Sequence, residues 1–329
     1  MFSDMDFHDI ESVVLGKPEI RSNGNGSRAG TKIYEQVGNT PLLRISAFDD
    51  ELPKEVQIFG KAEWFNPGCS VKDRPALNII LEAEESGDLD GEKILLDASS
   101  GNTAKAYAMY GAARGHKVTL CVPENANGEL LKTLRAYGAE LILAPAGESS
   151  DGAIRKAREL HNEHPGKYFY ADQYNNPANW QAHYRTTGVE IWRQTGGRVT
   201  HFIAGLGTSG TFTGTSRRLK QFNQDIQVYS VQPDSPLHGL EGLKHMPSAI
   251  VPGIYDQTLA AENLEISTEA AQDMVKKLSR EEGLFIGLSA GANLVGAMQI
   301  ARELDGGTIV TIFPDDGRRY INETFWEDE

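Results

Sequence analysis

Lys72 is the first candidate for chemistry in this sequence. It lies in residues 66–76, NPGCSVKDRPA, a compact turn that ends where a helix is expected to begin. Two other loops of small polar residues accompany it, SSGNT at 99–103 and GLGTSGT at 205–211. A lone lysine is usually a solvated surface residue. A lysine together with two such loops indicates instead a lysine that forms a Schiff base, with separate sites for a carboxylate and a phosphate.

The loop at 205–211 favours a single phosphate group. It follows the apolar run 202–204 and precedes a helical segment, and its three glycines let the backbone approach an anion closely. Hydroxyl donors come from Thr208, Ser209 and Thr211. The loop has no lysine of the GxxxxGK[ST] kind and no complete GxGxxG spacing, so neither a triphosphate nor a dinucleotide is favoured. An ordinary glycine-rich turn is the alternative.

Two further helix starts carry polar side chains that could contact a ligand. In the loop at 99–103, Asn102 can donate its amide to a ring oxygen, and the small donors around it can hold a carboxylate. In residues 287–292, GLSAGA, the hydroxyl of Ser289 could meet a ring nitrogen. Each of these residues could instead be a helix cap. Pyridoxal phosphate has an aldehyde, one phosphate, a phenolic oxygen and a ring nitrogen, so it matches the lysine, the phosphate loop, Asn102 and Ser289 together.

Short apolar runs alternate with helical segments along the chain that must position these loops. The strand-like runs are 93–96, 117–122, 140–143, 200–204, 228–231 and 308–313. The helical segments are 103–114, 129–137, 153–161, 211–222, 269–281 and 290–303. This alternation predicts an α/β fold of right-handed βαβ units with mostly parallel sheets. The two glycine-rich strand-to-helix turns predict two doubly wound domains with a cofactor cleft between them.

Composition excludes several classes of function. A formal charge of −14 argues against binding to nucleic acid or to an anionic membrane, and the chain has no apolar run long enough to span a bilayer. Only two cysteines are present, Cys69 and Cys121, so we expect no disulfide framework and a reducing, cytoplasmic setting. Residues 1–11 lack the basic and apolar regions of a secretory signal. None of the eight histidines has a metal-ligand spacing, so we expect no metal site.

In combination, the motifs resemble the cysteine synthase family, the β-replacement branch of the fold-type II pyridoxal-phosphate enzymes, whose fold is tryptophan synthase β-like. The resemblance runs from about Tyr34 to about Phe325. The motifs that carry it are VGNTPL at 37–42, residues 66–74, SGNT at 100–103, Gln173 with NPAN at 176–179, residues 207–211, and Ser289 with residues 291–292.

The resemblance implies a role for each of these residues. Lys72 carries the cofactor and moves the Cα proton, Asn102 contacts the ring oxygen, and Ser289 meets the ring nitrogen. The cofactor phosphate is held by Gly207, Thr208, Ser209, Gly210 and Thr211. The substrate carboxylate is received by Ser99, Ser100, Gly101, Thr103 and Gln173.

The resemblance also implies the reaction, a β-replacement on an activated serine that yields L-cysteine through an aminoacrylate. In residues 237–247, LHGLEGLKHMP, the chain resembles the second cysteine synthase type, in which an arginine stands where Lys244 stands here. In members that use O-phosphoserine, this basic residue recognises the substrate phosphate, so O-phosphoserine ranks slightly ahead of O-acetylserine. An exposed lysine on the domain rim is the alternative reading of Lys244.

Several rival functions and partners remain open at this point. A serine or threonine dehydratase, a cystathionine β-synthase-like enzyme and a non-catalytic binding module could share the scaffold. The sulfur donor could be sulfide, thiosulfate or the thiocarboxylate of a sulfur-carrier protein. The family implies a homodimer.

We expect three parts in the chain. Residues 1–30 form a flexible N-terminal arm, because 22–27 (SNGNGS) has the composition of a linker. Residues 48–176 form a smaller substrate-carboxylate domain that carries Lys72 and the SGNT loop. Residues 31–47 and 177–326 form a larger phosphate-binding domain.

Some residues depart from the family pattern or stay undecided. The family often has glycine where Cys69 stands, threonine where Ser99 stands, and glycine where Ala104 stands. Cys69 could be an oxidation-sensitive thiol, although a small filler is the more ordinary interpretation. In FPDDG at 313–317, one of Asp315 and Asp316 could face the cleft, and solvated turn acids are the alternative.

Overall fold

The computed structural model describes residues 30–327 except 146 and 148. The predicted N-terminal arm therefore lies, apart from its last residue, outside the described residues. Within the described part, no helix combines the length and the apolar character that crossing a membrane requires.

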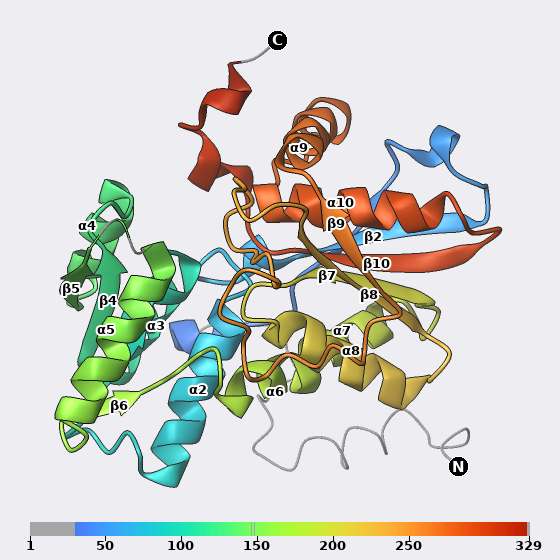
Figure 1. The fold of residues 1–329 in the computed structure, drawn as a ribbon. Coiled ribbons are helices and arrows are strands. Elements are labelled where there is room, and N and C mark those ends of the chain that lie inside the picture. Colours follow the sequence, from blue (N-terminus) through green and yellow to red (C-terminus); the bar gives the residue numbers. More distant parts are fainter. Residues whose placement is uncertain (1–29, 146, 148, 328–329) are drawn as a thin grey trace.

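Two separate β-sheets form the frame of the molecule (Figure 1). The larger sheet has the strand order β1-β2-β10-β7-β8-β9, and its strands are β1 Leu42–Ile45, β2 Val56–Ala62, β7 His201–Gly205, β8 Gln227–Pro233, β9 Glu262–Ile266 and β10 Gly307–Phe313. The smaller sheet has the order β5-β4-β3-β6, and its strands are β3 Ile94–Ala98, β4 Val118–Pro123, β5 Glu140–Ala144 and β6 Tyr168–Tyr170. Among the described residues, all strand pairs are parallel except β1 with β2. The predicted α/β class with mostly parallel sheets is confirmed.

The order of the strands reverses once in each sheet. In the larger sheet the chain moves outward from β7 to β8 and β9, and then returns to form β10 on the other side of β7. In the smaller sheet it moves from β3 to β4 and β5, and then forms β6 on the other side of β3. Ligands of doubly wound sheets bind beyond the carboxyl ends of the strands at such a reversal. The fold therefore predicts a ligand site at the loops after β3, β6, β7 and β10.

Helices cover both faces of each sheet (Figure 1). In the smaller half they are α2 Asp73–Ser86, α3 Asn102–Arg114, α4 Gly128–Ala136 and α5 Ser149–Glu163. In the larger half they are α6 Pro177–Arg185, α7 Thr187–Gln194, α8 Gly210–Phe222, α9 Thr268–Glu282 and α10 Leu288–Ala301. Short 3-10 turns complete the fold at η1 Ile33–Gln36, η2 Asp49–Glu51, η3 Glu63–Phe65, η5 Gly317–Tyr320 and η6 Thr324–Trp326.

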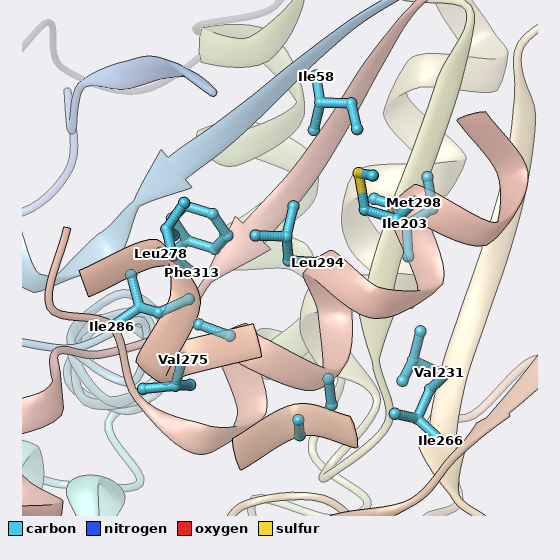
Figure 2. Close-up of a cluster of buried hydrophobic side chains, with 14 of the residues drawn as sticks. Ile58, Ile203, Val231, Ile266, Val275, Leu278, Ile286, Leu294, Met298 and Phe313 are labelled. Atoms are coloured by element: carbon cyan, nitrogen blue, oxygen red, sulfur yellow. The ribbon is translucent and has the colours of Figure 1, made fainter. Parts of the chain in front are cut away.

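The largest hydrophobic cluster joins the larger sheet to α9 and α10 (Figure 2). It brings together Ile203 of β7, Phe313 of β10, Leu278 of α9 and Leu294 of α10. Because α10 lies between the sheet and α9, it is apolar and buried almost all round. The rigid packing fixes the N-terminus of α10, where Ser289 lies, relative to the ends of β7 and β10.

Every strand and helix expected from the sequence is present, and the largest difference in bounds is at α5, which begins at Ser149 instead of 153. One domain boundary is wrong. A boundary at residue 48 would assign β2 to the smaller domain, whereas β2 pairs along its whole length with β10 of the larger sheet, from Val56 to Ala62. β2 lies inside the sheet between β1 and β10, but its mixture of polar and apolar residues, with a buried Lys61, is not typical of an interior strand.

Candidate active site

The loops at the two strand reversals line one cavity of about 590 Å³. Nearly all predicted site residues are part of its lining, namely Lys72, Ser99, Ser100, Gly101, Asn102, Thr103, Gln173, Gly207, Thr208, Ser209, Thr211, Lys244 and Ser289. Gly210 is not part of the lining. It begins α8 and packs so closely against Asn179 that an added Cβ would lie 1.9 Å from the Asn179 Oδ1 atom.

Lys72 stands immediately before α2, where the chain is fixed to the end of β10. The backbone amide of Val71 donates a 2.8 Å hydrogen bond to the carbonyl oxygen of Pro314. Burial lowers the pKa of the Lys72 amine, and the nearby carboxylate of Asp315 opposes this shift. An amine with a lowered pKa is a better nucleophile toward a carbonyl, and a better base near neutral pH, than a solvated lysine.

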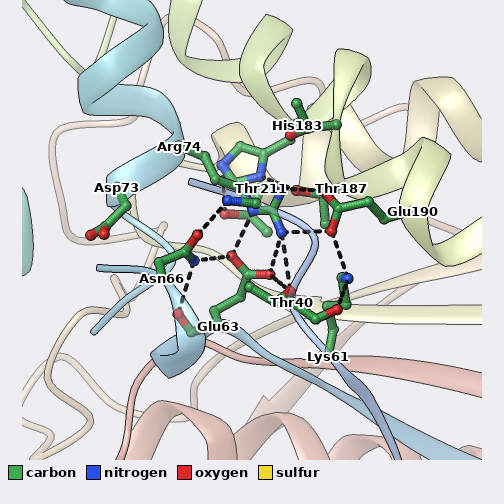
Figure 3. Close-up of polar contacts among 12 residues, drawn as sticks. Thr40, Lys61, Glu63, Asn66, Asp73, Arg74, His183, Thr187, Glu190 and Thr211 are labelled. Atoms are coloured by element: carbon green, nitrogen blue, oxygen red, sulfur yellow. Dashed lines mark hydrogen bonds and ion pairs between the residues drawn. The ribbon is translucent and has the colours of Figure 1, made fainter. Parts of the chain in front are cut away.

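A buried ion-pair network begins two residues after Lys72 (Figure 3). Arg74 lies 2.7 Å from Glu63 through Nε and 2.7 Å from Glu190 through Nη1. Lys61 of β2 pairs with the same Glu190 at 2.7 Å. Although burial opposes ionisation, the two cations hold the pKa of Glu190 well below its usual range. The network therefore anchors the start of α2, and with it the backbone of Lys72, to β2 and α7.

The loop after β7 is shaped to admit an anion. The backbone of Ser209 is left-handed, with φ 66°, and its buried hydroxyl oxygen has no hydrogen-bond partner among the described residues. An added Cβ on Gly207 would lie 2.2 Å from the carbonyl oxygen of Gly242, so only glycine fits there. A buried hydroxyl without a partner is costly unless a ligand satisfies it. Together with the N-terminus of α8, these features fit a phosphate group.

Thr211, at the end of this loop, is held by a buried histidine that the motifs did not reveal. Its Oγ1 atom lies 3.3 Å from Nε2 of His183, and Nδ1 of His183 lies 2.9 Å from Oγ1 of Thr187 (Figure 3). Burial, assisted by the positive charges of Arg74 and Lys72, holds the pKa of His183 well below its usual value. A neutral imidazole donates at one nitrogen and accepts at the other. When Nε2 donates to Thr211, the Thr211 hydroxyl proton is free to bind a phosphate.

The loop after β3 holds the predicted carboxylate site. The Oγ atom of Ser99 accepts a 3.2 Å hydrogen bond from the backbone amide of Gly101. Gln173, after β6, donates through Nε2 to the carbonyl oxygen of Ala98 at 2.9 Å, which ties the two loops together. Asp97 is buried below them, and burial raises its pKa to about 7 although backbone amides donate to it.

Asp315 lines the cavity. It is 4% exposed, and its Oδ2 atom accepts hydrogen bonds from Asn102 at 2.7 Å and from the Tyr320 hydroxyl at 3.1 Å. Its Oδ1 atom is buried without a partner in the described part of the chain. Burial raises the pKa of Asp315. The neighbouring Asp316 instead caps η5 and pairs with Arg318, so the two acids have different surroundings.

Arg319 also lines the cavity, and none of the sequence motifs indicated it. Its guanidinium lies over the SGNT loop, because an added Cβ on Gly101 would be 3.1 Å from Nη2 of Arg319. Arg319 also forms an ion pair with Glu241. These contacts connect the segment after β10 with both the SGNT loop and residues 237–247. No local sequence signal marks this arginine.

Ser289 and Lys244 reach the cavity from the side of the larger sheet. Ser289 is 4% exposed in the first turn of α10. The backbone amide of Lys244 donates to the carbonyl oxygen of Leu206 at 2.8 Å, so Lys244 lies beside the phosphate loop. Its Nζ atom is 3.7 Å from Oδ1 of Asp151 and 5.1 Å from the centre of the Tyr174 ring.

The donor set of the cavity fits pyridoxal phosphate. It offers a lysine amine of lowered pKa, the unpaired Ser209 hydroxyl in a loop before a helix, and the polar side chains of Asn102 and Ser289. In the part of the chain that the structure describes, no three His, Cys, Asp or Glu side chains are grouped to hold a metal ion.

Comparison with known proteins agrees with this donor set. Residues 33–315 match the family model described as pyridoxal-phosphate dependent enzyme. The chain is 48% identical over 307 residues to a cysteine synthase of Aquifex aeolicus, covering 92% of this chain and 94% of that protein. It is 39% identical over 297 residues to cysteine synthase B of Escherichia coli, covering 90% and 96%. A crystal structure of cysteine synthase from Entamoeba histolytica superposes with a TM-score of 0.87 at 32% identity, covering 96% of this chain and 94% of that one. The chain belongs to the pyridoxal-phosphate dependent enzymes, and within them to the cysteine synthase family.

Proposed function

We propose that this chain makes L-cysteine by exchanging the β-substituent of an activated serine for a sulfur nucleophile, with pyridoxal phosphate as cofactor. The observation that carries the proposal is the convergence of Lys72, the phosphate loop 205–211 and the loop 99–103 on one cavity. The proteins it resembles along most of its length are named cysteine synthases, which supports the same reaction.

Each group in the cavity has a task in this reaction. Bound pyridoxal phosphate supplies a place for the negative charge that develops at the substrate Cα atom. The Nζ atom of Lys72, with its lowered pKa, takes the proton from Cα and returns it to the product. The loop 99–103 and Gln173 hold the substrate carboxylate. Ser289 offers a neutral hydroxyl to the ring nitrogen. A ring with this partner is a weaker electron sink than a ring whose nitrogen is paired with a carboxylate, and it favours loss of the β-substituent.

We propose O-phosphoserine as the preferred activated serine and O-acetylserine as the second candidate. The support is Lys244, which lines the cavity beside the phosphate loop and carries the one positive charge of residues 237–247. A lysine ammonium binds phosphate as a point charge, without the bidentate fork of an arginine. The sulfur donor would be sulfide, thiosulfate or the thiocarboxylate of a carrier protein. We further propose a cytoplasmic homodimer, on the resemblance to the family.

The direct test is to supply the purified protein with pyridoxal phosphate, sulfide and either serine derivative, and to measure cysteine. We expect cysteine from both substrates, with a higher kcat/KM for O-phosphoserine, and none from Lys72→Ala. Lys244→Ala should lower kcat/KM for O-phosphoserine more than for O-acetylserine. Pyruvate in place of cysteine would identify a dehydratase, and an equal effect of Lys244→Ala on both substrates would contradict the preference for phosphate.

A further inference from the structure

Lys244 faces a carboxylate across the cavity. Asp151 lies in the first turn of α5, which packs on the smaller sheet, whereas Lys244 lies beside the loop after β7 of the larger sheet. The Lys244 Nζ atom is 3.7 Å from Asp151 Oδ1, and both residues line the cavity. The lysine side chain is 13% exposed and the aspartate side chain 34% exposed. The pair therefore connects the two halves of the molecule at the site proposed for the leaving group.

Tyr174 completes this cluster. The Lys244 Nζ atom lies 5.1 Å from the centre of its ring, a favourable distance for a cation on an aromatic face. Burial, with added effect from Asp97 and Asp151, raises the pKa of Tyr174, so its hydroxyl remains neutral. Lys244 therefore meets one neutral ring and one negative charge, and Asp151 is the group that offsets its charge.

The other cations of the lining are also matched by acids. Arg319 pairs with Glu241, and the charge of Asp315 acts on Lys72. Each of the cations Lys72, Lys244 and Arg319 therefore has a carboxylate nearby. None of these three offers an unopposed positive charge to a phosphate in the cavity. The Lys244 Nζ atom and the Asp151 Oδ1 atom are 3.7 Å apart, which is long for an ion pair. This pair lies beside the position proposed for the leaving group. Removing the charge of Asp151 leaves the Lys244 ammonium, whose side chain is 13% exposed, beside the neutral Tyr174 ring.

We propose that Asp151 determines leaving-group specificity, by reducing the attraction of Lys244 for a doubly charged phosphate relative to an uncharged acetyl group. This inference rests on the proposed function, in which the leaving group of an activated serine meets Lys244. Asp151 acts through Lys244, because its negative charge offsets the attraction of the ammonium for a phosphate. It does not take part in moving the Cα proton.

The test compares kcat/KM for the two substrates in the holoenzyme. Asp151→Asn keeps the size of the side chain and removes its charge. We expect the ratio of kcat/KM for O-phosphoserine to that for O-acetylserine to rise about tenfold, which corresponds to about 1.4 kcal/mol. Glu159→Gln is the matched control, since Glu159 lies on the same helix, is half exposed and pairs with Lys156. An unchanged or lower ratio in Asp151→Asn, or an equal rise in Glu159→Gln, would overturn the proposal.

A second measurement separates this inference from the proposed substrate. Inorganic phosphate is used as a competitive inhibitor of O-acetylserine, and its inhibition constant is compared between variants. Asp151→Asn should tighten phosphate inhibition about tenfold, and the gain should vanish in the double variant with Lys244→Ala. If neither enzyme consumes O-phosphoserine, the substrate preference fails, while the inhibition constant still decides on Asp151. A gain that persists without Lys244 would contradict the role given to this pair.

Discussion

The Nδ2 atom of Asn102 donates a 2.7 Å hydrogen bond to Oδ2 of Asp315, across 213 positions of the chain. The contact joins the start of α3 in the smaller half to the end of β10 in the larger half. Because Asp315 only accepts when ionised, it fixes which side of the Asn102 amide points toward it. The second Nδ2 hydrogen is then available to the ring oxygen of the cofactor, which gives Asp315 a positioning role.

Asp315→Asn should lower kcat/KM about tenfold, because the hydrogen bond to a charged acceptor is lost. It should also lower the pKa of Lys72 further, since the carboxylate of Asp315 favours the ammonium form. In the cofactor-free protein, the rate at which Lys72 reacts with an amine reagent should therefore rise at a lower pH than in the wild type. This shift is a readout that a merely structural defect would not produce.

Asp316→Asn is the control for this variant. Asp316 is adjacent in sequence, but its side chain pairs with Arg318 and caps η5, a role that asparagine can also fill. We expect kcat/KM and the reactivity profile of Lys72 to stay close to the wild type. A profile shifted as much in Asp316→Asn as in Asp315→Asn would contradict the assignment to Asp315.

The phosphate loop gives a second prediction, through Thr211. Thr211→Val removes the hydroxyl that contacts His183 at the proposed phosphate site, so bound pyridoxal phosphate should dissociate about ten times more readily, measured by equilibrium dialysis. Thr213→Val is the matched control, because Thr213 lies on the same helix and its hydroxyl is directed to the carbonyl oxygen of Ile254. The control should lose some stability and retain the cofactor. Equal loss of cofactor in both variants would show that the effect is not specific to Thr211.

Local sequence patterns predicted many of the strands and helices of the two sheets, and they predicted the loops of the site. Apolar runs and glycine-ended helices predicted six strands and six helices, and the loops 99–103 and 205–211 lie at the carboxyl ends of β3 and β7. The two strand reversals that bring these loops together explain why Gln173, after β6, belongs with the SGNT loop after β3. An acid two residues after the buried strand β10 was a signal for Asp315, but the reversal that places it in the cavity is a property of the whole sheet.

Other site residues could not be found in this way. Arg319 and His183 lie within helical or turn segments with ordinary polar neighbours, and their roles arise from contacts with Gly101 and Thr211 that are distant in sequence. Similarly, residues 56–62 fall within the predicted smaller domain, because the pairing of β2 with β10 depends on a segment about 250 positions later. Contacts of this kind depend on tertiary packing, and no single segment encodes them.

The buried network gives a third prediction. Glu190→Gln should lower the free energy of unfolding by about 3–5 kcal/mol at neutral pH, because it leaves Arg74 and Lys61 with one carboxylate fewer in a buried site. Since the folded-state pKa of Glu190 is below its ordinary value of 4.5, its contribution is complete above that pH and declines as the pH falls further. Urea denaturation should therefore show the difference from the wild type narrowing in acid.

Glu51→Gln is the control for Glu190→Gln. Glu51 pairs with Lys277 and Arg302, but all three side chains are substantially exposed. Exposed ion pairs contribute less than about 1 kcal/mol, so this variant should unfold nearly as the wild type does. A loss as large as that of Glu190→Gln would mean that burial of the network is not the reason for its effect.

The last prediction concerns the turn that carries Lys72. Cys69 has a left-handed backbone, with φ 63°, and its amide donates to the carbonyl oxygen of Asn66 at 2.8 Å. Residues with a Cβ are strained in this conformation, whereas glycine is not. Cys69→Gly should therefore be more stable to urea than Cys69→Ala by about 1 kcal/mol, because both variants lack the thiol and only alanine keeps the strain. If the alanine variant were equally or more stable, the turn would tolerate a side chain without cost, and the strain at Cys69 could not explain a preference for glycine in the turn that carries Lys72.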